Sequence, residues 1–159
     1  MSVLVVGGGI AGWTVASSLR AGGYAEPITV VESQPALYDR PPLSKSALVT
    51  GAPLESLAFA TPEECAAQAI DIVTGRRVVA IDAAARSAAL DDGTALTADE
   101  LVLAPGAAAR RPDWPGADDP RVGLLRDYAD AIALRAAAAG GRVVVLGAGL
   151  IGAEAASGL

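Results

Sequence analysis

The stretch "SVLVVGGGIAG", residues 2–12, joins a short apolar run to a group of closely spaced glycines. An apolar run rich in β-branched residues is typical of a buried parallel strand. Residues 10–20 then have the pattern of a helix, which the glycines of "AGG" end. The run "PITVVES", residues 27–33, predicts a second buried strand. The N-terminus therefore predicts a βαβ unit.

The glycines between the first strand and the helix match the pattern GxGxxG at Gly7, Gly9 and Gly12. In such a turn the first glycine allows tight bending, the second admits a pyrophosphate and the third lets helix and strand pack closely. The helix N-terminus offers free N–H groups and a positive dipole end to the anion. Glu32, 20 residues past Gly12, can accept hydrogen bonds from ribose hydroxyls. We therefore predict a dinucleotide site; the alternative is a glycine turn that serves packing alone.

A second turn of the same kind appears in "VVVLGAGLIGAE", residues 143–154, where Gly147, Gly149 and Gly152 follow the first motif by 140 residues. Residues 142–146, four apolar residues after Arg142, predict a strand, and a helix follows the glycines. Two such turns predict two dinucleotides, a flavin at one site and a nicotinamide at the other, with a hydride passing between them. Because the chain stops inside the second helix, we expect it to be the N-terminal part of a longer protein.

Between the two glycine turns, the sequence has short segments with helix or strand patterns, separated by turns. The run "TPEECAAQAI", residues 61–70, predicts a helix with Thr61 as its N-cap and a proline in its first turn. Residues 126–139 predict an amphipathic helix. Short strands are predicted at residues 71–73, 76–82, 86–91, 94–97 and 101–104, with "DDG" as a turn. The pattern predicts an α/β fold.

The proline box "YDRPPLSK", residues 38–45, follows the predicted βαβ unit. Its two prolines argue against a helix start or the centre of a strand. We expect them to hold the segment extended, with one cation, Arg40, directly before them and a second, Lys45, at the end of the run.

Composition excludes several other classes of protein. Twelve basic and 18 acidic residues give a net charge of −6, which disfavours a nucleic-acid partner. No apolar run reaches the roughly 18 to 20 residues that cross a bilayer, and no signal peptide precedes the first strand. With one cysteine, Cys65, and no histidine, the chain has no disulfide framework, CxxC pair or His/Cys metal site. We expect a cytoplasmic protein in which Cys65 is a buried, inert thiol.

Four segments in order, "GGGIAGWTVASSLRAGGYAEPITVVES", "YDRPPLSK", "YADAIALRAA" and "VVVLGAGLIGAEAA", resemble the ferredoxin/rubredoxin/putidaredoxin reductase family over essentially the whole chain. These are FAD-dependent, NAD(P)H-oxidising flavoproteins that supply electrons to oxygenase systems. The resemblance implies a Rossmann-like FAD-binding domain at residues 1–110, with a parallel sheet and an antiparallel β-meander. A linker and the first strand and helix of an NAD(P)-binding Rossmann domain would occupy residues 111–159.

The resemblance also implies which residues bind the cofactors. Lys45 would lie near the flavin ring, where an ammonium stabilises the anionic reduced flavin, and Glu154 would approach the nicotinamide; these two are the candidate catalytic residues. Without the resemblance, Lys45 would be a surface cation and Glu154 a solvated helix residue. The implied FAD set is Gly7, Gly9, Ala11, Gly12, Glu32 at the adenosine ribose, Arg40, Lys45, Val78 at the adenine and Arg126, and the NAD(P) set is Gly147, Gly149, Ile151, Gly152 and Glu154.

The absence of cysteine from the proline box excludes a relay through a redox disulfide there. We therefore expect electrons to pass from NAD(P)H via FAD to a ferredoxin- or rubredoxin-type acceptor. Two alternatives remain: a general NAD(P)H:acceptor flavoprotein, or a truncated dinucleotide-binding fragment without activity. One departure concerns "LVLAPG", residues 101–106, where many relatives have threonine in place of Pro105. Loss of that hydroxyl and N–H is expected to alter the flavin site if either group supports it.

Overall fold

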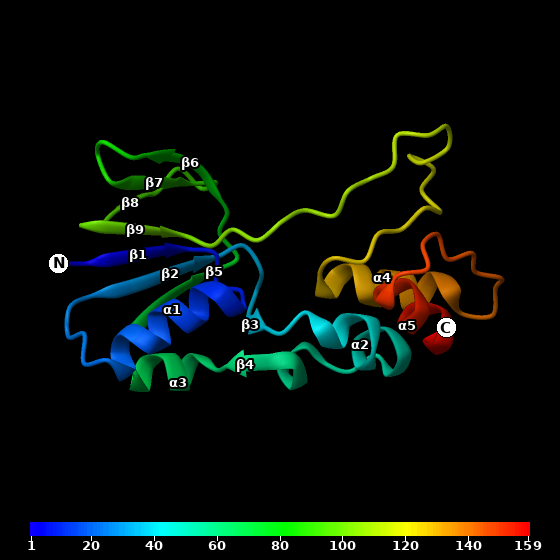
Figure 1. Ribbon diagram of the computed structural model, residues 1–159, viewed down its shortest axis with the longest axis horizontal. Helices are drawn as coiled ribbons and strands as arrows, with labels where there is room; N and C mark the ends of the chain where they lie inside the picture. Colours follow the sequence, from blue (N-terminus) through cyan, green and yellow to red (C-terminus); the bar gives the residue numbers. More distant parts are fainter. The chain divides into compact units, whose positions relative to one another are not determined.

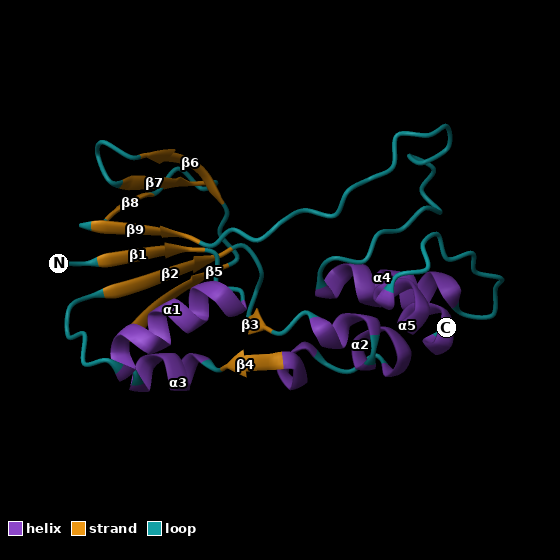
Figure 2. Cartoon of the chain, viewed as in Figure 1, coloured by secondary structure: helices purple, strands orange, loops and turns teal.

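The computed structural model describes residues 1–159, which form two compact units (Figures 1 and 2). Unit 1 comprises Met1–Tyr38 and Ala58–Gly106, and unit 2 comprises Asp39–Leu57 and Ala107–Leu159. The chain therefore passes between the units more than once. The expected division into functional domains at residues 1–110 and 111–159 is a separate question and stays a prediction.

Unit 1 is built on a parallel four-stranded sheet with strand order β5-β2-β1-β9. Its strands are β1 (Val3–Val6), β2 (Ile28–Glu32), β5 (Ile70–Thr74) and β9 (Glu100–Leu103). Helix α1 (Ile10–Ala21) connects β1 to β2. The predicted βαβ unit and parallel sheet are confirmed, which places the glycine turn at the carboxyl end of a central strand.

The sheet is buried on both faces, which explains why β1 is a continuous apolar run. On one face Val3 and Val5 pack with Ala16 of α1 and with Trp13. The other face packs against the β-meander, and its contacts include Leu4 and Val6 of β1 and Ala88 and Leu90 of the meander. Alternate residues of one strand thus contribute to two core clusters.

The meander is an antiparallel three-stranded sheet, as predicted from the alternating middle of the chain. It consists of β6 (Val78–Asp82), β7 (Ser87–Leu90) and β8 (Ala95–Thr97) in sequential order. In the turn of "DDG", Gly93 has φ of +86°, a conformation that glycine adopts without steric cost. The fold class predicted from the sequence, a parallel sheet plus an antiparallel meander, is confirmed.

A short two-stranded sheet and a helix complete unit 1. Strands β3 (Leu37–Tyr38) and β4 (Ala58–Ala60) pair antiparallel. Helix α3 (Pro62–Ala67) begins at the predicted N-cap, where Thr61 and Glu64 form a capping box. The helix ends before residue 70 because Ala69 takes a left-handed conformation, with φ of 52°, and Ile70 already belongs to β5.

Unit 2 contains short helical elements that pack on one another. They are the 3-10 helices η1 (Pro41–Ser44) and η2 (Leu54–Leu57), and the α-helices α2 (Ser46–Thr50), α4 (Tyr128–Ala138) and α5 (Leu150–Gly158). Helices α4 and α5 each contact both η1 and α2. The Tyr128 hydroxyl donates to the Ala52 carbonyl at 3.0 Å, and Arg135 donates to the Leu48 carbonyl at 3.3 Å. The proline box is therefore held by the C-terminal helices.

Two expectations for this unit are wrong. The prolines of the box do not hold it extended: Pro41 and Pro42 begin η1, where a missing N–H removes no helical hydrogen bond. The strand predicted over residues 142–146 is not formed. A strand requires a paired neighbour, and these apolar residues have none, so that Val144 is 82% exposed. Helix α5 forms as predicted. None of the helices is both long and apolar enough to span a membrane.

Candidate functional site

The first glycine turn has the shape that a dinucleotide phosphate requires. Gly7 has φ of +100°, and a Cβ there would lie 2.1 Å from the Ala104 carbonyl oxygen. A Cβ on Gly12 would lie 1.9 Å from the Gly7 carbonyl oxygen, so only glycine allows α1 to approach the turn this closely. At Gly9, by contrast, no atom lies within 4 Å of a built Cβ. The first and third glycines permit packing, whereas the second leaves open space.

The N-terminus of α1 opens onto that space. Gly9 is the N-cap of the helix and provides no side-chain cap, so no side chain satisfies the N–H groups of the first turn. Ala11, in that turn, is exposed. Free N–H groups at the positive end of a twelve-residue helix can bind an anion. The residues present therefore fit a pyrophosphate.

Glu32 lies at the carboxyl end of β2, next to the glycine turn. It is 6% exposed, and one carboxylate oxygen accepts from the Gly8 N–H at 2.7 Å. The other oxygen accepts from the Gln34 N–H at 2.8 Å and from the Ser33 hydroxyl at 3.1 Å. These bonds fix the carboxylate beside the glycine turn, and an acid at the end of the second strand is where a dinucleotide site would have its acceptor of ribose hydroxyls.

The sequence also singles out two further positions of unit 1, Val78 and Pro105. Val78 begins β6 and packs, half-buried, against the cluster that contains Leu90. The Ala104 N–H makes the last bond to β1, to the Val6 carbonyl at 2.8 Å. Pro105 follows it, with its Cα 3.1 Å from a built Cβ on Gly7. The missing N–H of Pro105 therefore removes no bond from the sheet, although the residue borders the glycine turn.

The proline box brings Arg40 and Arg126 together in unit 2. The Arg40 guanidinium donates to the Arg126 carbonyl at 2.9 Å, and the Arg126 N–H donates to Asp130 at 2.8 Å. The Nε atom of Arg126 is buried and has no hydrogen-bond partner. A buried donor without a partner costs about 1–3 kcal/mol, which makes this atom suited to an acceptor on a bound ligand.

Lys45 and Glu154, the two candidate catalytic residues, form an ion pair in unit 2. The Lys45 Nζ lies 3.4 Å from Glu154 Oε1. The Ser44 hydroxyl donates to Glu154 Oε2, so each carboxylate oxygen has its own partner. The Ser44 bond, and to a lesser degree Lys45, holds the pKa of Glu154 below its ordinary value, against the opposing effect of desolvation. Sequence reasoning missed Ser44; its one signal was its place beside Lys45 in the box.

The second glycine turn repeats the backbone conformation of the first, although a Cβ on its first glycine, Gly147, would meet no atom within 4 Å. Gly147 has φ of +113°, and a Cβ on Gly152 would lie 2.1 Å from the Gly147 carbonyl oxygen. Gly149 is open and is the N-cap of α5 without a side-chain cap. Ile151, in the first turn of α5, is 59% exposed. The geometry of the turn is thus present although no strand precedes it.

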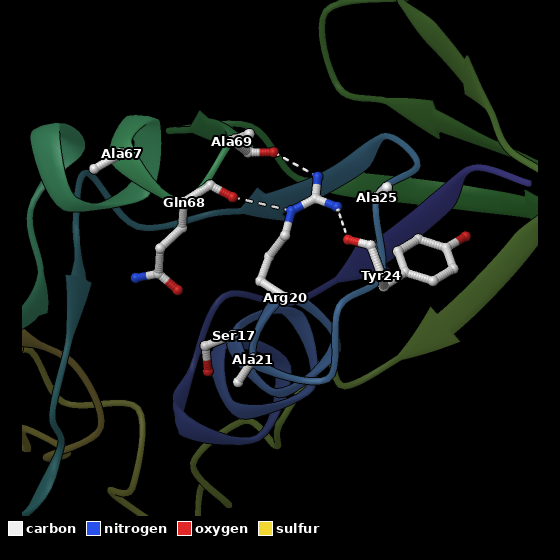
Figure 3. Close-up of a pocket in the computed structure, with 8 residues that line it drawn as sticks. All are labelled: Ser17, Arg20, Ala21, Tyr24, Ala25, Ala67, Gln68 and Ala69. Carbon is white, nitrogen blue, oxygen red and sulfur yellow. Dashed lines mark hydrogen bonds between the residues drawn. The ribbon is translucent and has the colours of Figure 1, made fainter.

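A pocket of about 480 Å³ in unit 1 lies beside α1, and Arg20 is one of the residues that line it. Its guanidinium donates to the carbonyls of Gln68 at 2.9 Å, Ala69 at 2.6 Å and Tyr24 at 2.5 Å (Figure 3). Because all three nitrogens of Arg20 bind backbone carbonyls, the residue ties α1 to the start of β5. We assign this arginine a structural role.

Cys65 is buried, as predicted, and packs with Leu37 and Ala60. Burial is the main cause that raises the pKa of its thiol, and the neighbouring Glu64 carboxylate adds to it. No group of His, Cys, Asp and Glu side chains in the chain could hold a metal ion. The thiol is therefore suited to packing rather than to redox or metal chemistry.

Comparison with known proteins gives consistent matches over the whole chain. The family described as "Pyridine nucleotide-disulphide oxidoreductase" matches residues 1–159. The chain is 40% identical to rhodocoxin reductase of Rhodococcus erythropolis over 99% of its own length and 37% of that protein. It is 37% identical to the ferredoxin–NAD(+) reductase subunit of a benzene 1,2-dioxygenase system of Pseudomonas putida, over 98% of this chain and 38% of the relative. The chain thus spans less than half the length of these relatives.

Solved structures of reductases also match this chain over nearly its whole length. A ferredoxin reductase from Rhodopseudomonas palustris superposes with a TM-score of 0.92 at 39% identity, over 99% of this chain and 41% of that one. Putidaredoxin reductase, in a covalent complex with putidaredoxin, superposes with a TM-score of 0.84 at 40% identity, over 98% and 39% of the two chains.

Proposed function

Because the chain belongs to the pyridine nucleotide-disulphide oxidoreductase family, we propose that it binds FAD and NAD(P)H and passes electrons from NAD(P)H to a ferredoxin-type iron–sulfur protein. The observation that carries the proposal is the pair of glycine turns. Each has a first glycine in the left-handed region, an open second glycine and a third glycine closed against the first. Relatives named as ferredoxin reductase components of dioxygenase systems, at 37% to 41% identity, support the choice of acceptor.

In unit 1 the first turn would hold FAD. The open space at Gly9 and the N–H groups of the first helical turn, including that of Ala11, suit the pyrophosphate. Gly7 and Gly12 allow the turn to close. Glu32 would accept hydrogen bonds from the adenosine ribose, and the backbone at Val78 would meet the adenine.

For the basic residues of unit 2, the family resemblance supports a contact with FAD. Arg126 has a buried donor available for it, and Arg40 fixes the Arg126 backbone. When bound there, FAD would supply the chemistry that joins a two-electron donor, NAD(P)H, to a one-electron acceptor. The Lys45 ammonium would stabilise negative charge that develops on the ring, because a fixed cation needs little reorganisation.

The second turn would hold the pyrophosphate of NAD(P)H. Gly149 offers the open space and Ile151 a free N–H at the start of α5, while Gly147 and Gly152 allow closure. Glu154, one turn further along α5, would approach the nicotinamide side. The proline box holds no cysteine that could relay electrons, so electrons would pass directly from the flavin to the protein acceptor.

The test uses two reciprocal variants and two ligands. Gly9→Ala places a methyl group in the first open space and Gly149→Ala in the second, and neither has an atom within 4 Å to clash with. We expect Gly9→Ala to weaken FAD binding, measured by flavin fluorescence, with no effect on NAD(P)H binding. Gly149→Ala should weaken NAD(P)H binding alone. Equal FAD affinity in wild type and Gly9→Ala would contradict the assignment of the first turn.

A further inference from the structure

The carboxylate of Glu154 has two partners, Ser44 and Lys45, which differ in burial. Ser44, which donates to Oε2, is 5% exposed. The side chain of Lys45, which pairs with Oε1, is 57% exposed. A carboxylate bound at one oxygen by a buried hydroxyl cannot rotate freely, so its other oxygen keeps a fixed direction toward the ammonium.

The backbone explains why the two partners act together. Ser44 is the last residue of η1, and the Lys45 N–H closes that helix by donating to the Pro42 carbonyl at 3.0 Å. Pro41 and Pro42 fix φ in the first turn of η1. The hydroxyl and the ammonium therefore project from neighbouring residues of one stiff turn, and little backbone entropy remains to oppose their shared contact with Glu154.

No other charged group competes for Glu154. Helix α5 has no second charged residue, and η1 and α2, the elements packed against it, contain none. Arg40, before η1, donates to the Arg126 carbonyl, and Arg135 of α4 donates to carbonyls of α2. The ionisation of Glu154 thus depends on Ser44 and Lys45.

We propose that Ser44 is a positioning residue, which holds the Glu154 carboxylate at Oε2 and so directs Oε1 at Lys45, so that the ammonium is held in one orientation. The role of this arrangement in electron transfer rests on the function proposed above. The hydroxyl itself touches only Glu154, so Ser44 acts on Lys45 through the carboxylate. Loss of the hydroxyl should leave Glu154 less acidic and Lys45 less restrained.

The first arm of the test follows the Glu154 carboxyl carbon by ¹³C NMR across a pH titration of the cofactor-free chain, with Glu154→Gln to assign the signal. Ser44→Ala should raise the pKa of Glu154 toward its ordinary value, because the bond that favours the ionised form is gone. Ser46→Ala is the matched control: Ser46 is exposed, lies two residues further along, and its hydroxyl makes no hydrogen bond. It should leave the titration unchanged.

Ser44→Cys provides a second variant if Ser44→Ala does not fold, because a thiol has nearly the same size but is a weak donor. It should also raise the pKa of Glu154. An unchanged Glu154 titration in a folded Ser44 variant, or an equal shift in Ser46→Ala, would overturn the proposal.

The second arm measures the pH profile of flavin bleaching by NAD(P)H in the protein loaded with FAD. If Glu154 must be ionised to hold Lys45, the acid limb of the profile should move to higher pH in Ser44→Ala and stay in place in Ser46→Ala. An acid limb that stays in place in Ser44→Ala would overturn the link to electron transfer. Absence of bleaching in the wild type would overturn the proposed function instead, and the titration of the cofactor-free chain would still decide whether Ser44 holds Glu154.

Discussion

Substitution of Gly12 by alanine is expected to destabilise unit 1 because the added methyl group has nowhere to go. Its Cβ would lie 1.9 Å from the Gly7 carbonyl oxygen and 3.0 Å from the carbonyl carbon, both backbone atoms of the turn. Ordinary contact requires about 3.4 Å or more, so α1 and the turn must separate by more than an ångström. Overpacking of this kind costs about 1–3 kcal/mol.

Gly9→Ala is the matched control, because its Cβ meets no atom within 4 Å. Urea unfolding, followed by circular dichroism, should give a lower free energy of unfolding for Gly12→Ala, by about 1–3 kcal/mol. The change for Gly9→Ala should be at most about 1 kcal/mol, typical of exchanging glycine for alanine at an N-cap. Equal stability of the two variants would refute the claim that the third glycine is required by the close approach of α1.

Three further predictions concern other parts of the chain. In Gly158→Ala the added Cβ would lie 2.3 Å from Val49 Cγ2, so the free energy of unfolding should fall by about 1 kcal/mol. Adding Val49→Ala to that variant should restore part of the lost stability. If it restores none, this contact is not the cause. Hydrogen bonds from the Ser2 backbone N–H and hydroxyl hold the pKa of Asp99 below its ordinary value of 3.8. The ionised Asp99 carboxylate therefore stabilises the fold above pH 3.8, and this stability is lost as the pH falls through the lowered folded-state pKa. Asp99→Asn should therefore flatten the acid side of the stability curve measured by urea unfolding, and an unaltered curve would contradict this. Cys65, buried with a raised thiol pKa, should react with a thiol reagent at the rate of unfolding rather than that of a free thiol, and rapid labelling in native buffer would argue against its burial.

The sequence predicted the parts of the fold that local pattern determines. The apolar run ending at Val6, the glycine turn and α1 each have a local sequence pattern that predicts them. The strands of the meander are short segments separated by turn residues, which also predict them. The conformation of Gly7 and the closure at Gly12 follow from the GxGxxG spacing, since only glycine tolerates both.

The parts that sequence reasoning missed depend on contacts between distant segments. The apolar run at residues 142–146 has the pattern of a strand, but a strand needs a partner and none is present. The two prolines of the box argued against a helix start, and this was wrong: proline is tolerated in a first helical turn, and Pro41 and Pro42 begin η1. Ser44 meets Glu154 across 110 residues of sequence, and no local pattern reports such a contact.

The same limit applies to the assignment of the cofactor residues. The cofactor roles of Arg40 and Lys45 come from the resemblance, and within unit 2 the structure adds that Arg40 binds the Arg126 backbone and that Lys45 pairs with Glu154. The buried, unpartnered Nε of Arg126 could not be inferred from the sequence, because burial of one atom depends on the packing of its neighbours.

The most direct test of the central claim is an anaerobic titration of the FAD-loaded protein with NADH and NADPH, with the visible flavin spectrum recorded before a ferredoxin is added. We predict a bound flavin band that bleaches on addition of one of the two nicotinamides and returns when oxidised ferredoxin is supplied. A protein that binds no FAD, or whose bound flavin is not bleached by either nicotinamide, would contradict the claim that this chain carries electrons from NAD(P)H to an iron–sulfur partner.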